Sequence, residues 1–212
     1  MSLDKEVVAI LLGDGHVSSR GIISMHHSAS QKEYLLYKVS CLEKHGFKLK
    51  VRDTERMSYG VIRKFVKAEG YSSTDSKELR NIMYPNGNKI APSEFVSEFD
   101  FKDWSFIFMD DGRCNSISHT NNLIDNIRVR KETERFTNRY EICTESFDIH
   151  SQNILISNLL KNNVEAYLSS RNRIVISKSA SKVAFYEGVK DFVVPSMDYK
   201  ISALPSLSYK LQ

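Results

Sequence analysis

The sequence has few of the residues that mark disulfide-rich, secreted or membrane-spanning proteins. Its three cysteines, Cys41, Cys114 and Cys143, are odd in number, lie far apart and form no CxxC pair. A disulfide framework and a structural zinc site are therefore not expected. No apolar run of about 18 residues occurs, and the N-terminus lacks a basic flank followed by a small-residue cleavage site. We expect an intracellular protein in a reducing compartment, with no membrane segment.

Motifs of several enzyme classes are missing as well. The chain contains no Walker loop, GxGxxG, HExxH or nucleophile elbow, and its six histidines show no metal-ligand spacing. Enzymes that bind phosphate-bearing cofactors and zinc hydrolases are thus unsupported. With 41% hydrophobic and 26% charged residues, the 212-residue chain has the composition of a globular protein with one large domain or two small ones.

The charge is weakly positive and evenly divided. The net charge of +4 permits a polyanionic partner but does not require one. Residues 1–100 hold 15 Lys and Arg and 13 Asp and Glu, and residues 101–212 hold the same numbers. This equality suggests an internal repeat.

The order of predicted elements also repeats. Residues 3–13 and 99–110 both read as buried helices that end at an Asp-Gly pair, the second with Asp100 as N-cap. The first half continues with strand residues 21–27, a helix over 30–45, strands 47–53 and 59–68 and a helix over 76–83. The second half continues with strands 127–132 and 139–145, a helix over 151–162, a strand over 166–178 and a helix over 179–192.

We therefore predict an α+β fold of two similar halves, residues 1–98 and 99–212. The connection over residues 92–100 is neither Gly/Ser-rich nor of low complexity, so the halves should be rigidly coupled. One half of about 100 residues would have a marginal core alone, whereas two packed together would not.

Two acids occupy matching places in this repeat. Asp14 and Asp111 each follow an apolar helix, at the negative end of the helix dipole, where a carboxylate needs a cation. If the helices pack about a pseudo-twofold axis, the two carboxylates meet and favour a hard divalent ion such as Mg²⁺. A single Asp-Gly pair is more often a simple turn, but its recurrence in both halves favours a metal site.

These residues resemble a known family. Residues 8–15 (VAILLGDG) and 105–112 (SFIFMDDG) are similar to the two signature helices of single-chain, pseudo-dimeric LAGLIDADG homing endonucleases. Residues 86–92 (NGNKIAP) and 194–201 (VPSMDYKI) resemble the lysine-bearing segments that close each half in that family. The most specific short match is P-S-M-x-Y-K, and the resemblance extends along almost the whole chain.

The resemblance implies two αββαββα halves whose curved antiparallel sheets form a saddle over double-stranded DNA. It implies a monomeric, site-specific endonuclease of intron or intein mobility that cuts a long, non-palindromic target by metal-dependent phosphodiester hydrolysis and leaves short 3′ overhangs. Asp14 and Asp111 would then be catalytic and bind Mg²⁺, with Mn²⁺ or Ca²⁺ able to substitute for binding. Lys89 and Lys200 would assist catalysis. The extra acid, Asp110, is expected to cap or solvate the helix end.

Basic residues at strand spacing indicate the surface that would contact DNA. Lys48, Lys50 and Arg52 should lie on one face of their strand, with Phe47, Leu49 and Val51 on the other. A half-exposed antiparallel sheet also has a polar outer face, but basic runs in both halves favour DNA binding. The predicted DNA-binding residues are Lys48, Lys50, Arg52, Arg63, Lys67, Arg128, Arg130, Arg171 and Arg173.

Two other functions remain open at this stage. One is an RNA maturase that keeps the same fold and assists splicing of its host intron, although RNA binding alone would not require both motif acids. The other is a DNA-binding regulator, which would be favoured by an added helix-turn-helix segment for which the chain has no length left. The residues do not indicate the target sequence, and an organellar, phage or bacterial origin is equally open.

Overall fold

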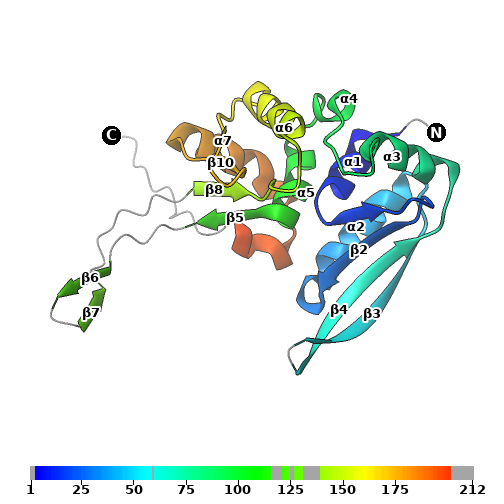
Figure 1. The fold of residues 1–212 in the computed structure, drawn as a ribbon, viewed down its shortest axis with the longest axis horizontal. Coiled ribbons are helices and arrows are strands. Elements are labelled where there is room, and N and C mark those ends of the chain that lie inside the picture. Colours follow the sequence, from blue (N-terminus) through cyan, green and yellow to red (C-terminus); the bar gives the residue numbers. More distant parts are fainter. Residues whose placement is uncertain (1–2, 59, 116–120, 125–126, 131–138, 202–212) are drawn as a thin grey trace.

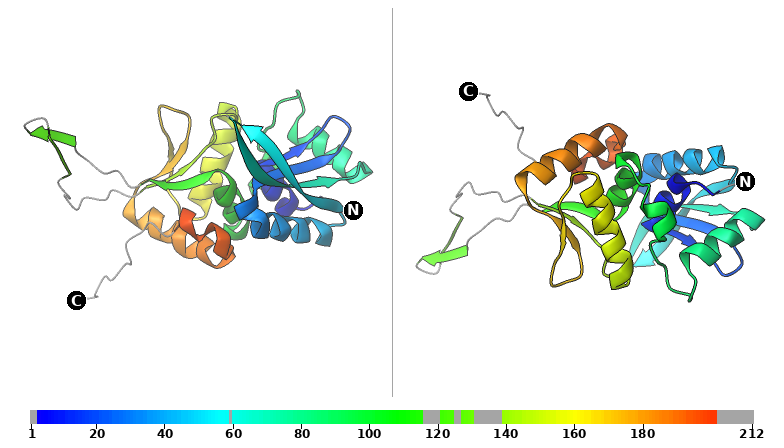
Figure 2. Two further views of the ribbon diagram at one scale, coloured as in Figure 1. Left: turned by 90° about the horizontal axis from the view of Figure 1, so that it is seen from below. Right: turned by 90° about the horizontal axis from the view of Figure 1, so that it is seen from above.

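The computed structural model describes residues 3–58, 60–115, 121–124, 127–130 and 139–201. Two halves lie side by side, with helices α1 (Lys5–Leu12) and α5 (Phe101–Asp111) in contact between them (Figure 1). Two further views show the N-terminal and C-terminal halves on opposite sides of this helix pair (Figure 2). The predicted buried helices are thus confirmed as the centre of the molecule.

The first half has the predicted αββαββα order. A four-stranded antiparallel sheet with strand order β1-β2-β4-β3 forms its frame. Its hairpin of β3 and β4 extends beyond the helices (Figure 1). The elements after α1 are β1 (Gly15–Val17), β2 (Ile23–Ser28), a 3₁₀ turn (Ala29–Gln31), α2 (Lys32–Lys44), β3 (Leu49–Ser58), β4 (Val61–Gly70) and α3 (Thr74–Met83).

The second half repeats this order with an insertion. Its four-stranded antiparallel sheet has the order β5-β8-β10-β9. Two further strands, β6 and β7, separate β5 from β8 along the chain and, among the described residues, pair with each other. The elements after α5 are β5 (Gly112–Asn115), β6 (Asn121–Ile124), β7 (Ile127–Arg130), β8 (Arg139–Ile142), α6 (Ile149–Lys161), β9 (Tyr167–Leu168), β10 (Ile174–Ile176), α7 (Ser179–Val189) and two 3₁₀ helices (Lys190–Phe192 and Pro195–Lys200).

Two strand predictions were wrong in detail. Residues 127–132 were expected to be a sheet strand after α5, but β5 begins directly at Gly112, and β7 belongs to the inserted pair. The expected long strand over 166–178 is a hairpin of β9 and β10. Its turn depends on Asn172, which adopts φ 55° and donates its backbone N–H to the Ser169 carbonyl.

The connection between the halves packs against the second half. It contains the short helix α4 (Ser93–Val96), which contacts α6. The backbone N–H of Ala91 donates to Ser151 Oγ at 3.0 Å, and Lys161 Nζ donates to the Ser97 carbonyl at 2.9 Å. The helix α4 also contacts α1 of the first half.

The apolar face of each sheet packs on the helices. In the first sheet, Met25, Val66 and Ala68 are buried. In the second, Tyr140 meets Phe108 of α5 and Phe185 of α7 edge to face or tilted, at 5.3 and 5.5 Å between ring centroids. The opposite face of each sheet carries the charged residues described below.

Candidate active site

The two motif acids lie at the ends of the paired helices. Asp111 is the last residue of α5, and Asp14 follows α1 by two residues. Burial, followed by the negative charge of Asp110, raises the pKa of the Asp14 carboxyl. Burial, Asp110 and then Asp14 raise the pKa of Asp111 to about 7. The charge of Asp14 is thus felt by the Asp111 carboxyl at the neighbouring helix end.

The glycines after these acids are required for close approach. Neither glycine has left-handed backbone: Gly112 has φ −83°, and Gly15 is outside the left-handed region too. A Cβ on Gly15 would lie 2.5 Å from Leu11 Cα, and one on Gly112 would lie 2.4 Å from the Phe108 carbonyl oxygen. Each glycine lets a strand start directly against the last turn of its helix.

We expect Gly112→Ala to lower the free energy of unfolding by about 1–3 kcal/mol, because its new methyl group overpacks the Phe108 side chain. Urea denaturation would measure the loss. Gly70→Ala is the matched control, since its Cβ would come no closer than 3.3 Å to another atom, and its effect should be much smaller. Equal losses of unfolding free energy in both variants would show that close approach to Phe108 is not the reason for a glycine at position 112.

Two lysines bind the helix ends beside the acids. Lys89 Nζ donates to the carbonyl oxygens of Leu11, Leu12, Gly13 and Gly15 at 2.6–3.1 Å. Burial lowers the pKa of Lys89 to about 8, although nearby acids oppose this shift.

Lys200 occupies the corresponding place at the other helix. Its Nζ donates to the Asp110 carbonyl at 2.7 Å, and burial lowers its pKa. Each half therefore supplies one lysine to the end of its own central helix. The structure brings together the four residues that the resemblance selected, Asp14, Asp111, Lys89 and Lys200.

Asp110 has a different place from the one expected. Its carboxylate is completely buried, so it does not solvate the helix end. Lys38 Nζ of α2 donates to its two oxygens at 2.9 and 3.0 Å, and the backbone N–H of Asp14 donates to Oδ2 at 2.9 Å. Gly13 lies against the Asp110 carboxylate, and a Cβ on Gly13 would lie 2.4 Å from Asp110 Oδ2. Asp110 is thus a buried link between the halves, with its carboxylate already engaged by Lys38.

Sequence reasoning missed Lys38 and His27. Lys38 shares the buried face of α2 with Tyr34, Leu35 and Val39. A lysine on the otherwise apolar face of a helix was the signal in the sequence that could have identified it. His27 of β2 is also buried, with Nδ1 3.3 Å from Gln31 Oε1.

His27 lies beside the acids. Its Nδ1 is 3.8 Å from Asp14 Oδ2, and its Nε2 is 3.9 Å from Asp110 Oδ1. Burial and then the charge of Lys38 lower its pKa to about 4, so the imidazole is neutral at pH 7. Possible ligand atoms of Asp14, His27 and Asp110 lie within 4.8 Å of one another.

The donor set fits a hard divalent cation. Carboxylate oxygens are ligands that Mg²⁺ prefers. Burial and then the negative charge of Asp110 raise the pKa of both Asp14 and Asp111, and a bound cation would favour their ionised forms. Since the Asp110 carboxylate is engaged by Lys38, Asp14 and Asp111 stay the candidate metal ligands that the resemblance selected.

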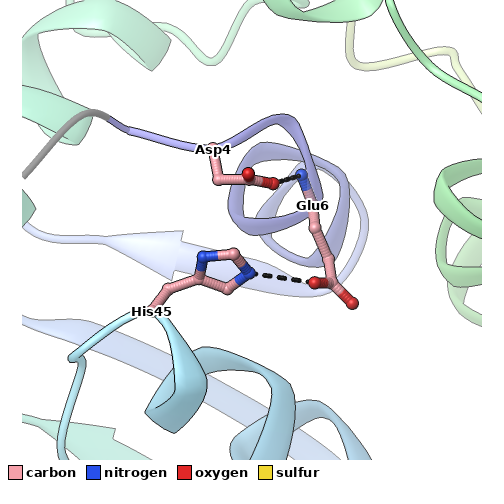
Figure 3. A group of neighbouring side chains, drawn as sticks. All are labelled: Asp4, Glu6 and His45. Carbon is pink, nitrogen blue, oxygen red and sulfur yellow. Dashed lines mark hydrogen bonds and ion pairs between the residues drawn. The ribbon is translucent and has the colours of Figure 1, made fainter.

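A second group of metal-ligand side chains lies at the other end of α1. Figure 3 shows Asp4, Glu6 and His45 close together. Asp4 caps α1 by accepting the backbone N–H of Glu6 at 2.8 Å, and the Glu6 carboxylate pairs with His45 and with Lys102. Helix capping and ion pairing account for this group.

The outer face of the first sheet carries the predicted basic residues. Phe47 is buried, and Leu49 and Val51 pack against the core, as expected. Lys50 lies opposite Glu69, and Arg52 lies opposite Lys67. Exposed Lys48 directly precedes β3, and exposed Arg63 lies further along β4. The alternation predicted for the strand of Lys48, Lys50 and Arg52 is confirmed.

The second sheet differs more from the prediction. Arg171 is exposed in the turn between β9 and β10, and Arg173 follows it. Arg128 and Arg130 lie in β7, outside the four-stranded sheet, and their side chains fall outside the described part of the structure. The sheet instead presents Arg113 of β5, which the sequence analysis did not select.

Comparison with known proteins supports this description. Residues 6–184 match the LAGLIDADG DNA endonuclease family. The fold is similar to that of the homing endonuclease I-WcaI bound to its DNA recognition sequence, with a TM-score of 0.71 and 19% sequence identity over 95% of this chain and 88% of that one. No curated protein matches significantly. Within the described residues, no helix is long and apolar enough to cross a membrane.

Proposed function

Because the chain belongs to the LAGLIDADG DNA endonuclease family, we propose that it is a homing endonuclease that cuts both strands of one long, asymmetric DNA target. Cleavage is divalent-metal-dependent phosphodiester hydrolysis and leaves short 3′ overhangs. The observation that supports this function most directly is the shared site of Asp14 and Asp111 at the ends of α1 and α5.

The acids and lysines have separate parts in this reaction. Asp14 and Asp111 would hold Mg²⁺ at the junction of the halves. A bound divalent cation lowers the pKa of water and stabilises negative charge on a reacting phosphate. Lys89 and Lys200 are held by backbone carbonyls beside the acids. The positive charge of each ammonium group would stabilise negative charge that develops on the phosphate.

The two outer sheet faces supply the DNA contacts. Basic side chains at alternate positions suit the phosphates and base edges of a major groove. The faces differ in sequence, with lysines Lys50 and Lys67 prominent on the first and Arg113 and Arg139 on the second. One chain with two different faces accounts for a monomer acting on a non-palindromic target.

A plasmid cleavage assay tests this function. The plasmid carries the duplex obtained by joining the two DNA sequences that flank the host intron or intein. In Mg²⁺ we expect one chain per plasmid site to convert the plasmid to a linear form, while a plasmid without the insert stays intact. Binding of the plasmid without its conversion to the linear form would contradict the proposed cleavage function.

Lys200→Met should separate chemistry from binding. We expect it to slow single-turnover cleavage by about a hundredfold or more, because it removes a cation beside the reacting phosphate, and to change affinity little. Lys48→Ala with Lys50→Ala should instead weaken binding and flatten its salt dependence by about one unit per lost phosphate contact. Equal losses of rate and affinity in both proteins would contradict this division.

A further inference from the structure

Each outer sheet face has an acid at the centre of its basic residues. An acid on a surface that binds phosphates weakens affinity by repulsion. Glu69 and Glu141 nevertheless occupy such positions. Their contacts show which basic side chains each acid fixes.

Glu141 on β8 binds two arginines, Arg113 and Arg139, and lies near a third, Arg173, whose closest acid is Glu145. Arg113 lies opposite it on β5 and donates from Nε and NH2 to Oε2 at 3.0 and 2.5 Å. Arg139, two residues earlier on β8, places NH2 2.5 Å from Oε1, and Arg173 places NH1 3.7 Å from Oε2. The Glu141 side chain is only 4% exposed, whereas the Arg113 and Arg139 side chains are 46% and 35% exposed. The carboxylate lies beneath guanidinium groups that still face outward.

Glu69 on β4 is likewise surrounded by basic side chains on the outer face of the first sheet. Its carboxylate pairs with Arg52 on β3 and with Lys67 on its own strand, the latter at 3.0 Å. Lys50 lies directly opposite it across the β3–β4 ladder. Glu69 and Glu141 belong to different strands of their sheets, so this arrangement is not a simple consequence of the repeat.

Holding these side chains changes what they can recognise. A free arginine or lysine contacts phosphates of any sequence, since its rotamers adapt. A guanidinium fixed by a carboxylate has lost this freedom before binding, and its remaining donors keep one direction. Fixed, bidentate donors are what distinguish guanine from other bases in the major groove.

We propose that Glu69 and Glu141 are positioning residues for sequence recognition, each fixing the basic side chains around it so that they read a short block of base pairs. This inference rests on the proposed function, because it requires DNA on the outer sheet faces. The two acids lower total affinity and raise the preference for the correct sequence. Each acid governs a different block, because the two sheets serve different halves of the target.

Selection from a random pool tests the proposal. Wild type, Glu69→Gln and Glu141→Gln are each used to retain duplexes with a randomised central segment, and the retained duplexes are sequenced. Glu165→Gln is the matched control: it makes the same charge change at an exposed pair with Lys178. Because Glu141→Gln leaves three arginines close together, Glu141→Asp is included, and thermal unfolding checks that every variant folds.

Glu141→Gln should reduce the preference by roughly tenfold or more at one block of base pairs, and Glu69→Gln should do so at a different block. Both should bind random-sequence duplex more tightly than wild type. Glu141→Asp, whose shorter side chain keeps the charge but misplaces it, should also lose preference without this gain. Glu165→Gln should retain the wild-type profile.

Unchanged profiles in Glu69→Gln and Glu141→Gln would overturn the proposal, as would the same loss in Glu165→Gln, which would indicate net charge alone. These outcomes differ from failure of the proposed function, in which wild type itself would retain no duplex.

Discussion

Asp14→Asn and Asp111→Asn are each expected to slow double-strand cleavage by at least about a thousandfold, the loss of several kcal/mol of transition-state stabilisation that a misplaced metal would cause. Affinity for the target should stay within a few-fold of wild type. The two acids lie at the helix junction, whereas the basic residues that we propose to contact phosphates lie on the sheet faces. Neither change should unfold the protein. Burial raises the pKa of both carboxyls, which means that folding disfavours their ionised forms, so a neutral amide in the same place should be tolerated.

Strand-resolved single-turnover cleavage and a binding assay in Ca²⁺ would measure these effects. Asp191→Asn, at an exposed position in the 3₁₀ helix after α7, is the matched control and should cleave like wild type. Full activity in either Asp14→Asn or Asp111→Asn would show that the acid is not part of the site. A parallel loss of affinity would place it among the DNA contacts instead.

Breaking the buried pair of Lys38 and Asp110 should have the largest effect on stability. Asp110→Ala or Lys38→Ala leaves one charge unpaired in a place where both side chains are fully buried. Such a loss costs about 3–5 kcal/mol of unfolding free energy. Asp110→Ala also removes the acceptor for the Asp14 backbone N–H, so it should reduce cleavage beyond its effect on the folded fraction.

Urea denaturation of the two single variants and of the double variant Lys38→Ala with Asp110→Ala would measure this coupling. The double variant removes both charges and should recover a large part of the summed loss. Lys178→Ala, which breaks an exposed pair with Glu165, should cost no more than about 1 kcal/mol. Losses of that size for Lys38→Ala and Asp110→Ala would mean that the buried pair contributes little.

The parts of the fold that follow from local patterns were predictable. Apolar residues on nearly all faces identified α1 and α5, and their recurrence led to Asp14 and Asp111. Alternation placed Lys50 and Arg52 on the outer face of β3. In the helices the signal is a continuous apolar run that recurs in the second half, and in the strand it is the two-residue alternation.

The unpredicted parts depend on residues far apart in the chain. Lys38 meets Asp110 across 72 positions, and no spacing rule links a lysine in one helix to an acid in another half. The residues expected to form a strand of the second sheet lie in the inserted pair of β6 and β7. The pattern IRVR indicates a strand but not the strand with which it pairs. The role proposed for Glu141 depends on arginines from different strands, Arg113 on β5 and Arg139 on β8.

Mapping the DNA ends after reaction with the joined flanking duplex tests the central claim most directly. We expect one double-strand break with short 3′ overhangs in Mg²⁺, no break when the metal is chelated, and none with Asp14→Asn or Asp111→Asn. A duplex that is bound but stays intact in Mg²⁺ and Mn²⁺, or a break that persists without metal, would contradict it.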